Sequence, residues 1–314
     1  MVPAIPAIQA RNSSKKTFWA PRVSITLHVV GLAQSYIGNI SGQQTSSSLA
    51  CSFLSAEKPK RAATIAQGVL DSIEQSHATE IDAELNGLPT RLSVTHDAEG
   101  SAITSDATQL FVAQNGELAV LQMPQPLALE CLERQRTWLF GPALILALAR
   151  HRVYCLHASS IAINGRAYVL IGRSGVGKST LAKAASQPLT DDISPIGDME
   201  LLPHFPQLKL KNEAYPNVAE RYQLGGFVHV TRAESDLENL SGMDAPTLMR
   251  LLLSHTIASK LFRTDELAPH FRWCAKLAEK YQASSAVLSP AYRQNAPQTA
   301  AASALIKLTE FAQR

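Results

Sequence analysis

A glycine-rich segment in the middle of the chain carries the residue types best suited to phosphate chemistry. It reads GRSGVGKS from Gly172 to Ser179 and fits the pattern G-x-x-x-x-G-K-[ST]. Glycines in such a loop let backbone N–H groups approach phosphate oxygens, and the following helix adds partial positive charge. Lys178 would hold the β- and γ-phosphates, and the Ser179 hydroxyl would bind Mg²⁺, so the segment predicts a site for ATP and Mg²⁺. The predicted nucleotide-binding residues are Gly172, Arg173, Ser174, Gly175, Val176, Gly177, Lys178, Ser179 and Thr180.

Two adjacent aspartates follow the lysine closely. Asp191 and Asp192 come 13 and 14 residues after Lys178, which leaves room for one short helix and a return segment. A helix over 179–186 would rise only about 12 Å, and Gln187-Pro188 would stop it. The segment PLTDDISPI then predicts a short strand that runs back toward the loop. Both carboxylates are therefore expected near the γ-phosphate.

The two carboxylates are expected to divide the work of phosphoryl transfer. One would lie at the metal ion, and the other would accept the proton of a hydroxyl nucleophile. We assign Ser179 and Asp192 as the metal ligands and leave open which aspartate is the base. A turn without a catalytic role is the competing interpretation, because aspartate is common in turns. Asp198, in PIGDME, is more typical of a loop residue.

A histidine precedes the loop by one predicted hairpin. His157 lies in VYCLHASSIAI, which is followed by Asn164-Gly165 and RAYVLIG, and this arrangement predicts two antiparallel strands. The commoner mononucleotide-binding domains instead use parallel strands joined by helices. Strand pairing would bring His157 to the mouth of the site to handle a proton or stabilise phosphate charge, and a purely structural histidine is the alternative. The predicted catalytic residues are His157, Lys178, Asp191 and Asp192.

The first half of the chain supplies supporting elements. Residues 23–30 and 90–97 alternate as strands do, and QLFVAQNGELAVLQM predicts a hairpin whose Asn115-Gly116 suits a type I′ turn. Residues 61–75 have the apolar spacing of a helix that covers one face of this sheet. A further, buried helix is predicted from about Pro126 to Arg150.

Composition argues against several classes of protein. The chain has 314 residues, of which 46 % are hydrophobic, and this supplies a core for one large or two ordinary domains. The net charge of +3 is too small to argue for a nucleic-acid or membrane partner. The apolar run over 138–149 is shorter than the roughly 20 residues that cross a bilayer. The four cysteines form no C-x-x-C pair, so no zinc site or disulfide framework is indicated, and a cytoplasmic protein is expected.

The stretch from Leu156 to Ile196 resembles the HPr kinase/phosphorylase-like family. The resemblance rests on LHASSIAINGRAYVLIG, on the loop GRSGVGKST and on the downstream DDISPI. It extends more loosely through PHFPQLKLKNEAY, GGFVHVTR and SSAVLSPAYR to about Arg293. Within the family, the chain is most similar to HPr kinase-related serine kinases, among them those that modify ribosomally made peptides such as lasso peptides.

The resemblance implies an α/β fold, namely a P-loop kinase core of HPr kinase/PEP carboxykinase-like topology with a mixed sheet. It also implies transfer of the γ-phosphate of ATP, with Mg²⁺, to a serine hydroxyl on a peptide or protein. We expect this catalytic domain over 151–314, preceded by an α+β N-terminal domain over 19–150 and a mobile leader over 1–18. The residues that match the family's site are His157, Lys178, Ser179, Asp191 and Asp192.

Two departures limit what the resemblance implies. Thr180 stands where HPr kinases usually carry glutamate, and their later RGxGIIDV-like segment has no counterpart. Both differences argue against HPr itself as the acceptor and against the reverse phosphorylase reaction. Lys209 and Lys211, in LKLKNEAY, are candidates for clamping phosphate or acceptor, and the alternative is that they protect a strand edge. Arg232, after GGFVHV, is a further candidate for nucleotide contact.

Three functions are open at this point. The leading one is an ATP-dependent kinase for a serine-type hydroxyl on a peptide or protein. The second is a kinase for a small molecule such as a free hydroxy amino acid. The third is a nucleotide-sensing binding protein without phosphotransfer, whose ligand controls association through the N-terminal half. The sequence leaves the identity of the acceptor and a homo-oligomeric state undetermined.

Overall fold

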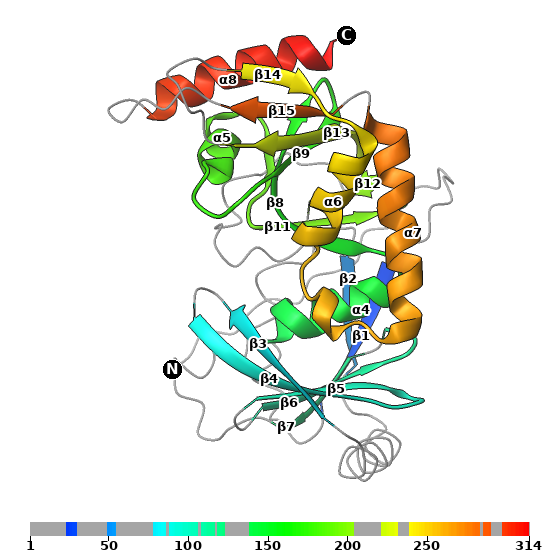
Figure 1. Ribbon diagram of the computed structural model, residues 1–314. Helices are drawn as coiled ribbons and strands as arrows, with labels where there is room; N and C mark the ends of the chain where they lie inside the picture. The colour runs from blue at the N-terminus through cyan, green and yellow to red at the C-terminus, as the bar shows by residue number, and fades with distance from the viewer. Residues whose placement is uncertain are drawn as a thin grey trace, which may run out of the picture.

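The computed structural model contains two sheets, with a buried helix between them (Figure 1). The fold is mixed α/β, as the sequence predicts, and the second sheet combines parallel with antiparallel pairs. Predictions for the leader, the helix over 61–75, Lys209, Lys211 and Arg232 lie outside the described residues. The structure describes residues 23–29, 49–54, 78–85, 88–105, 108–116, 118–122, 138–203, 221–231, 239–282, 285–289 and 297–313.

Among the described residues, the first sheet has seven strands in the order β2-β1-β7-β6-β5-β4-β3. Neighbours from β3 to β7 pair antiparallel, while β1 pairs parallel with both β2 and β7. The strands predicted over 23–30 and 90–97 are confirmed as β1 and β4. The strands are β1 (Val23–Val29), β2 (Leu49–Leu54), β3 (Thr79–Leu85), β4 (Leu88–His96), β5 (Gly100–Ser105), β6 (Thr108–Ala113) and β7 (Leu118–Gln122).

The hairpin of β6 and β7 is confirmed, but its predicted type I′ turn is wrong. A type I′ turn needs positive φ at both central residues, and of Asn115 and Gly116 only the glycine has it, at 82°. The Gly116 N–H donates to the Ala113 carbonyl over 2.9 Å. The strands end at Ala113 and begin again at Leu118, so the connection is longer than two residues and one glycine suffices to turn it.

The helix predicted up to Arg150 is present in its described part, and it is broken. Residues Leu139–Ala143 form a π-helical turn in which Gly141 has a non-helical ψ of −112° and Pro142 follows. A regular helix, α4 (Leu144–Arg150), continues from there. Proline cannot donate the backbone hydrogen bond that a continuous helix needs, which accounts for the break at this point.

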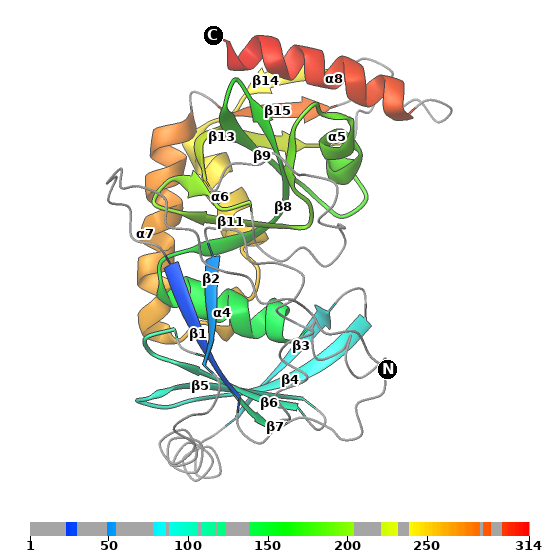
Figure 2. The same cartoon turned by 180° about the vertical axis from the view of Figure 1, so that it is seen from behind.

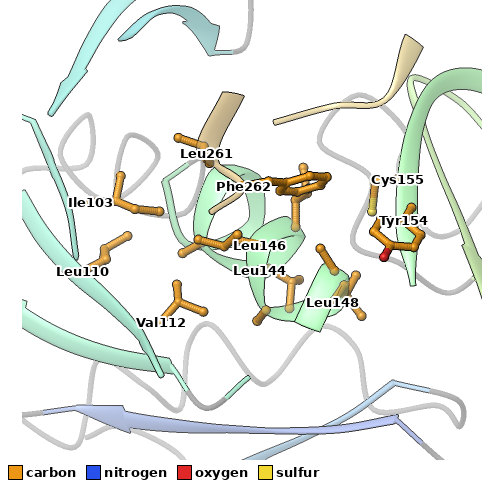
Figure 3. Packing of buried hydrophobic residues seen from close by; sticks show 14 of the residues in the cluster. Ile103, Leu110, Val112, Leu144, Leu146, Leu148, Tyr154, Cys155, Leu261 and Phe262 are labelled. Atoms are coloured by element: carbon orange, nitrogen blue, oxygen red, sulfur yellow. The ribbon is translucent and has the colours of Figure 1, made fainter. Parts of the chain in front are cut away.

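Helix α4 holds the two halves of the molecule together because it is apolar on all sides. Residues 144–149 are buried, and a helix that is hydrophobic all round belongs in a core. Figure 3 shows Leu144, Leu146 and Leu148 between side chains of the first sheet and side chains that follow the helix. The labelled neighbours from the first sheet are Ile103, Leu110 and Val112, and those from the other side are Tyr154, Cys155, Leu261 and Phe262.

Arg150 adds polar contacts at the end of this helix. Its Nε donates to Glu266 Oε1 over 2.9 Å, and its Nη2 donates to Ser101 Oγ over 2.6 Å. Its side chain is almost fully buried, with 3 % exposed. A buried guanidinium needs such partners to offset the cost of its desolvation. Arg150 therefore ties the first sheet to the helix that begins near Glu266, α7 (Thr264–Tyr281).

The second sheet has eight strands in the part of the chain that the structure describes, and its central strands form a closed ring. β8 pairs with β9, β9 with β13, β13 with β12, β12 with β11, and β11 again with β8. β9 and β13 are parallel to each other, whereas β8 and β9 are antiparallel. The strands are β8 (Tyr154–Ile163), β9 (Arg166–Ile171), β10 (Pro188–Thr190), β11 (Ile193–Gly197), β12 (Glu200–Leu201), β13 (Tyr222–Val230), β14 (Asn239–Gly242) and β15 (Ala286–Ser289).

The hairpin predicted at Asn164-Gly165 is confirmed as β8 and β9. Ile163 stands opposite Arg166, and both turn residues have positive φ, 52° at Asn164 and 73° at Gly165. These values are typical of a tight turn that matches the twist of the two strands. The hairpin fixes the register of His157 on β8 relative to the glycine-rich loop that follows β9.

Helices cover this sheet on two sides. On one side α5 (Lys178–Ala184) packs with α8 (Pro297–Ala312) through Leu181, Ala304 and Leu308. On the other side α6 (Ala245–His255) and α7 pack through Leu248, Leu252 and Leu277. Figure 2 shows α8 and α5 at the end farthest from the first sheet, whereas α7 runs alongside both halves. In the part of the chain that the structure describes, no helix is both long and apolar enough to cross a membrane.

Candidate functional site

The glycine-rich segment forms a loop between a strand and a helix, as the sequence predicts. β9 ends at Ile171 and α5 begins at Lys178, so the loop occupies 172–177. Gly175 and Gly177 have φ values of 78° and 103°, which other residues adopt only with strain. Gly177 immediately precedes the helix, so the loop leads directly into the positive end of the α5 dipole.

The lysine of the loop is buried and folded back over it. Lys178 is 7 % exposed. Its Nζ donates to the carbonyl oxygen of Gly172 over 2.7 Å and to that of Arg173 over 3.1 Å. The ammonium group therefore lies within the turn of the loop, where it can hold phosphate oxygens as a point charge.

The segment with the two aspartates is not the single strand that was predicted. β10 and β11 both pair antiparallel with β8, and Asp191 and Asp192 separate them. The register is the same on both sides of the pair, because Thr190 stands opposite Ser160 and Ile193 opposite His157. The strand is broken because Asp192 has a positive φ of 77°, a conformation that aspartate tolerates better than most residues. Because of this break, the carboxylates of Asp191 and Asp192 lie in different surroundings.

Asp191 points to the phosphate loop and is buried. It is 5 % exposed, and its Oδ1 accepts hydrogen bonds from Ser179 Oγ over 2.6 Å and from Ser159 Oγ over 2.9 Å. The sequence predicts Ser179 and Asp192 as the metal ligands, whereas in the structure the Ser179 hydroxyl is bonded to Asp191. Among the contacts described here, the Ser179 hydroxyl and the Asp191 carboxylate are the two neighbouring oxygen groups that suit Mg²⁺.

Asp192 is the more accessible of the two carboxylates. Its side chain is 28 % exposed, and its Oδ1 lies 3.4 Å from Nδ1 of His157, whose side chain is 39 % exposed. His157 is thus brought to the aspartate pair by the register of β8 and β11. At this distance the imidazole of His157 can orient the Asp192 carboxylate.

A group of buried hydroxyls lies behind the carboxylates, and the sequence analysis did not single it out. Ser194 Oγ lies 2.9 Å from Ser160 Oγ and 2.6 Å from Thr190 Oγ1, and it donates to the Ala158 carbonyl over 3.0 Å. These bonds fasten β10 and β11 to β8 on both sides of the aspartate pair. The only signal in the sequence is the run of small residues HASS, which also supplies the Ser159 hydroxyl that bonds Asp191.

A cavity of about 840 Å³ opens in front of these groups. His157, Asp192, Lys178 and Ser179 all line it. Its volume is in the range that is usual for small-molecule and cofactor sites. The structure thus brings together the loop lysine, the loop serine and the histidine–aspartate pair in one space. The first sheet, the start of the buried helix and the segment 254–261 form the remaining walls, which no local pattern in the sequence indicated.

His255, at the end of α6, is a cavity residue that the sequence analysis missed. Burial, together with the positive charges of Lys178, His157 and His229, lowers the pKa of His255 from 6.5 to about 4. The imidazole is therefore neutral at neutral pH and offers the cavity one hydrogen-bond donor and one acceptor. Nothing in the amphipathic pattern of α6 distinguishes this residue from an ordinary last-turn histidine.

The low pKa of His255 makes the stability of the fold depend on pH. As the pH falls from 6.5 toward about 4, the unfolded chain binds a proton that the folded protein rejects, so stability is lost over this range. We expect the melting temperature of the wild type to fall more steeply over this range than that of His255→Gln. Calorimetry of the two proteins at a series of pH values measures the difference, and parallel curves would contradict the assignment.

Asp198 lies away from the cavity. It is exposed in the turn between β11 and β12 with a φ of 49°, and this agrees with its interpretation as a loop residue. Cys155 and Cys274 are buried free thiols, as expected. Among the described residues, no group of three or more histidine, cysteine, aspartate or glutamate side chains suits a metal ion. Mg²⁺ in phosphate-loop sites is commonly held by one hydroxyl, one carboxylate, water and phosphate oxygens, and Ser179 with Asp191 fits that set.

No protein-family model and no curated protein matches the sequence.

Proposed function

We propose that this protein is an ATP-dependent kinase that transfers the γ-phosphate to a serine-type hydroxyl on a peptide or protein, in an HPr kinase-like core. One observation carries the proposal. The serine after the loop lysine is bonded to one aspartate, while the next aspartate faces the same cavity with a histidine. A protein that only binds a nucleotide needs the Ser179–Asp191 contact but not the Asp192–His157 pair. The second arrangement supplies the acid–base group that transfer to a hydroxyl needs.

The loop residues bind and orient the nucleotide in this proposal. The N–H groups of the loop and the start of α5 face the phosphate chain, and Lys178 exchanges its two carbonyl partners for phosphate oxygens. Ser179 and Asp191 provide the oxygen ligands for Mg²⁺. The bound ion neutralises negative charge that develops on the phosphates during transfer.

Asp192 is the base in this proposal. The acceptor hydroxyl oxygen forms a bond to the γ-phosphorus, the bond from that phosphorus to the β–γ bridging oxygen breaks, and ADP leaves. The hydroxyl proton passes to the Asp192 carboxylate. His157, at 3.4 Å, holds that carboxylate toward the cavity and can relay the proton to solvent, since both side chains are partly exposed. Asp191 does not suit this role, because two serine hydroxyls already occupy its Oδ1 and its side chain is buried.

Transfer of labelled phosphate tests the proposal. The protein is incubated with γ-labelled ATP, Mg²⁺ and a library of serine-containing peptides, and the products are located by mass spectrometry. We expect phosphoserine on a peptide subset, dependent on Mg²⁺. ATP binding without any labelled acceptor, tested also with free serine, would overturn the proposal and favour a nucleotide-sensing protein. Transfer to free serine alone would favour a small-molecule kinase.

Ser159→Ala is expected to weaken the use of Mg²⁺. Ser159 donates to the same Asp191 oxygen as Ser179 and so fixes the orientation of that carboxylate. Loss of such a supporting hydrogen bond typically costs about 10- to 100-fold in metal affinity or activity. The measurement is the Mg²⁺ concentration that gives half-maximal phosphotransfer.

Ser160→Ala is the matched control for this prediction. Ser160 is the next residue on β8 and is equally buried, but its hydroxyl contacts Ser194 rather than a carboxylate. Its Mg²⁺ dependence should equal that of the wild type. Equal shifts in the two variants would show that only the stability of β8 was affected, and the role of Ser159 would then be discarded.

A further inference from the structure

The wall of the cavity that faces the glycine-rich loop is built mainly by the first sheet and is largely apolar, and Asp82, which also borders the cavity, is paired with Arg91 over 3.4 Å. Ile81 and Ala83 of β3, Leu92 of β4 and Ile145 of α4 line it, together with Ile257 from the segment after α6. Ile81, Leu92 and Ile145 belong to the hydrophobic core, while Ala83 and Ile257 are only partly buried. The cavity therefore has a polar, catalytic side and an apolar side, contributed by different sheets.

The strand at this wall is an edge strand. β3 is the last strand of the seven-stranded sheet, and among the described strands it pairs only with β4. An edge strand presents backbone N–H and C=O groups that can pair with an additional strand. The part of β3 that borders the cavity is 81–83. A chain added along this edge would thus enter the space in front of Asp192.

We infer that the acceptor is an extended peptide that adds to β3 as a further strand, with an apolar side chain two residues before or after the phosphorylated serine. This inference rests on the proposed kinase activity and specifies its substrate. Main-chain hydrogen bonds to β3 supply sequence-independent affinity, and the pocket selects alternate side chains. Successive side chains of a strand point to opposite faces. A serine directed to Asp192 therefore shares its face of the added strand with the side chains two residues before and after it, and these side chains lie over Ile81 and Ala83 of the apolar wall.

The mode of binding excludes a free amino acid as the preferred acceptor. Free serine has no peptide N–H or C=O with which to extend a sheet, and it fills a small part of a cavity of about 840 Å³. The first sheet would then have no role at the cavity, although it contributes one of its walls. The proposed catalytic residues line only part of the cavity, and a role of the first sheet in binding the peptide explains why it lines another part.

Charge placed on the apolar wall provides the first test. Ala83→Lys puts an ammonium group at the edge of β3 inside the cavity, and Thr79→Lys puts the same group on the same strand outside the cavity lining, where Thr79 is exposed. We expect Ala83→Lys to raise the KM for the best peptide at least 10-fold with the KM for ATP unchanged. Thr79→Lys should leave both the KM for the peptide and the KM for ATP unchanged. Melting temperatures of both variants show that they fold, and equal peptide KM values would overturn the inference.

N-methylation of the acceptor peptide provides the second test. Each backbone nitrogen around the serine is methylated in turn, and phosphotransfer is measured at fixed ATP. Strand addition predicts loss of transfer at every second position, because alternate N–H groups of an added strand face its neighbour. Uniform tolerance, or free serine as good an acceptor as the peptide, would overturn strand addition while leaving the kinase activity intact. Absence of transfer to every acceptor would overturn both.

Discussion

Replacing Asp192 by asparagine is expected to slow phosphotransfer by about 10²- to 10⁴-fold, which is the usual contribution of a positioned general base. Asparagine has the same shape but cannot take the proton of the acceptor hydroxyl. Because the contacts of the loop with Asp191 and Lys178 are left in place, the affinity for ATP should change little. Single-turnover transfer from labelled ATP and a separate titration of nucleotide binding measure the two quantities.

Asp198→Asn is the control for this variant. Asp198 also has a positive φ in the turn after β11, but it is exposed and does not line the cavity. The transfer rate of this variant should equal that of the wild type. Asp191→Asn should differ from both, with a higher demand for Mg²⁺, since Asp191 contacts the loop serine. A fully active Asp192→Asn protein would remove Asp192 from the mechanism.

Replacing Lys178 by methionine is expected to lower phosphotransfer by about 10²- to 10³-fold, as the loss of one preorganised charge-stabilising donor does in other sites. Lys178 is 7 % exposed, and methionine keeps most of its buried stem while removing the ammonium group. The affinity for ATP should fall as well, because the lysine contacts phosphates in both the ground state and the transition state. Steady-state kinetics with ATP as the varied substrate separates the two effects.

Lys183→Met removes the same charge from the other end of the same helix and is the matched control. Lys183 lies in the last turn of α5 and is exposed. Its variant should bind ATP and transfer phosphate as the wild type does. If the two methionine variants behaved alike, the loop would not be the nucleotide site.

The parts of the site that could be predicted from sequence are those fixed by local chemistry. The phosphate loop needs glycines with positive φ next to a helix start, and the Asn164-Gly165 hairpin needs two residues that tolerate the same region. Both requirements restrict residue types within a few positions. The meeting of His157 with the aspartates depends in addition on the pairing of β8 with β11, in which Ile193 stands opposite His157.

The division of labour between the two aspartates could not be predicted in the same way. It depends on the positive φ of Asp192, which breaks the strand and separates the directions of the two side chains. In a continuous strand, the side chains of Asp191 and Asp192 would also lie on opposite faces. That alternation does not determine which of the two carboxylates Ser179 contacts. The contact is decided by where α5 lies over β8, and this follows from the packing of Leu181 in the core.

The apolar wall of the cavity is the part most remote from sequence patterns. Ile81 and Leu92 alternate as any half-buried strand residues do, and Ile257 follows a helix without a recognisable motif. Their meeting at the phosphate loop depends on the buried helix α4 and on the Arg150–Glu266 ion pair, which join segments far apart in the chain. Long-range packing of this kind leaves no periodic signal in one sequence.

The position of the metal ion tests the central claim most directly, since the account assigns Asp191 to the metal and Asp192 to the acceptor. A crystal structure with a non-hydrolysable ATP analogue and Mn²⁺, located by its anomalous scattering, gives that position. The account predicts Mn²⁺ bound by Ser179 and Asp191, with Asp192 and His157 facing the γ-phosphate from the open side of the cavity. A metal ion bound by Asp192, or a nucleotide bound away from the loop 172–177, would contradict it.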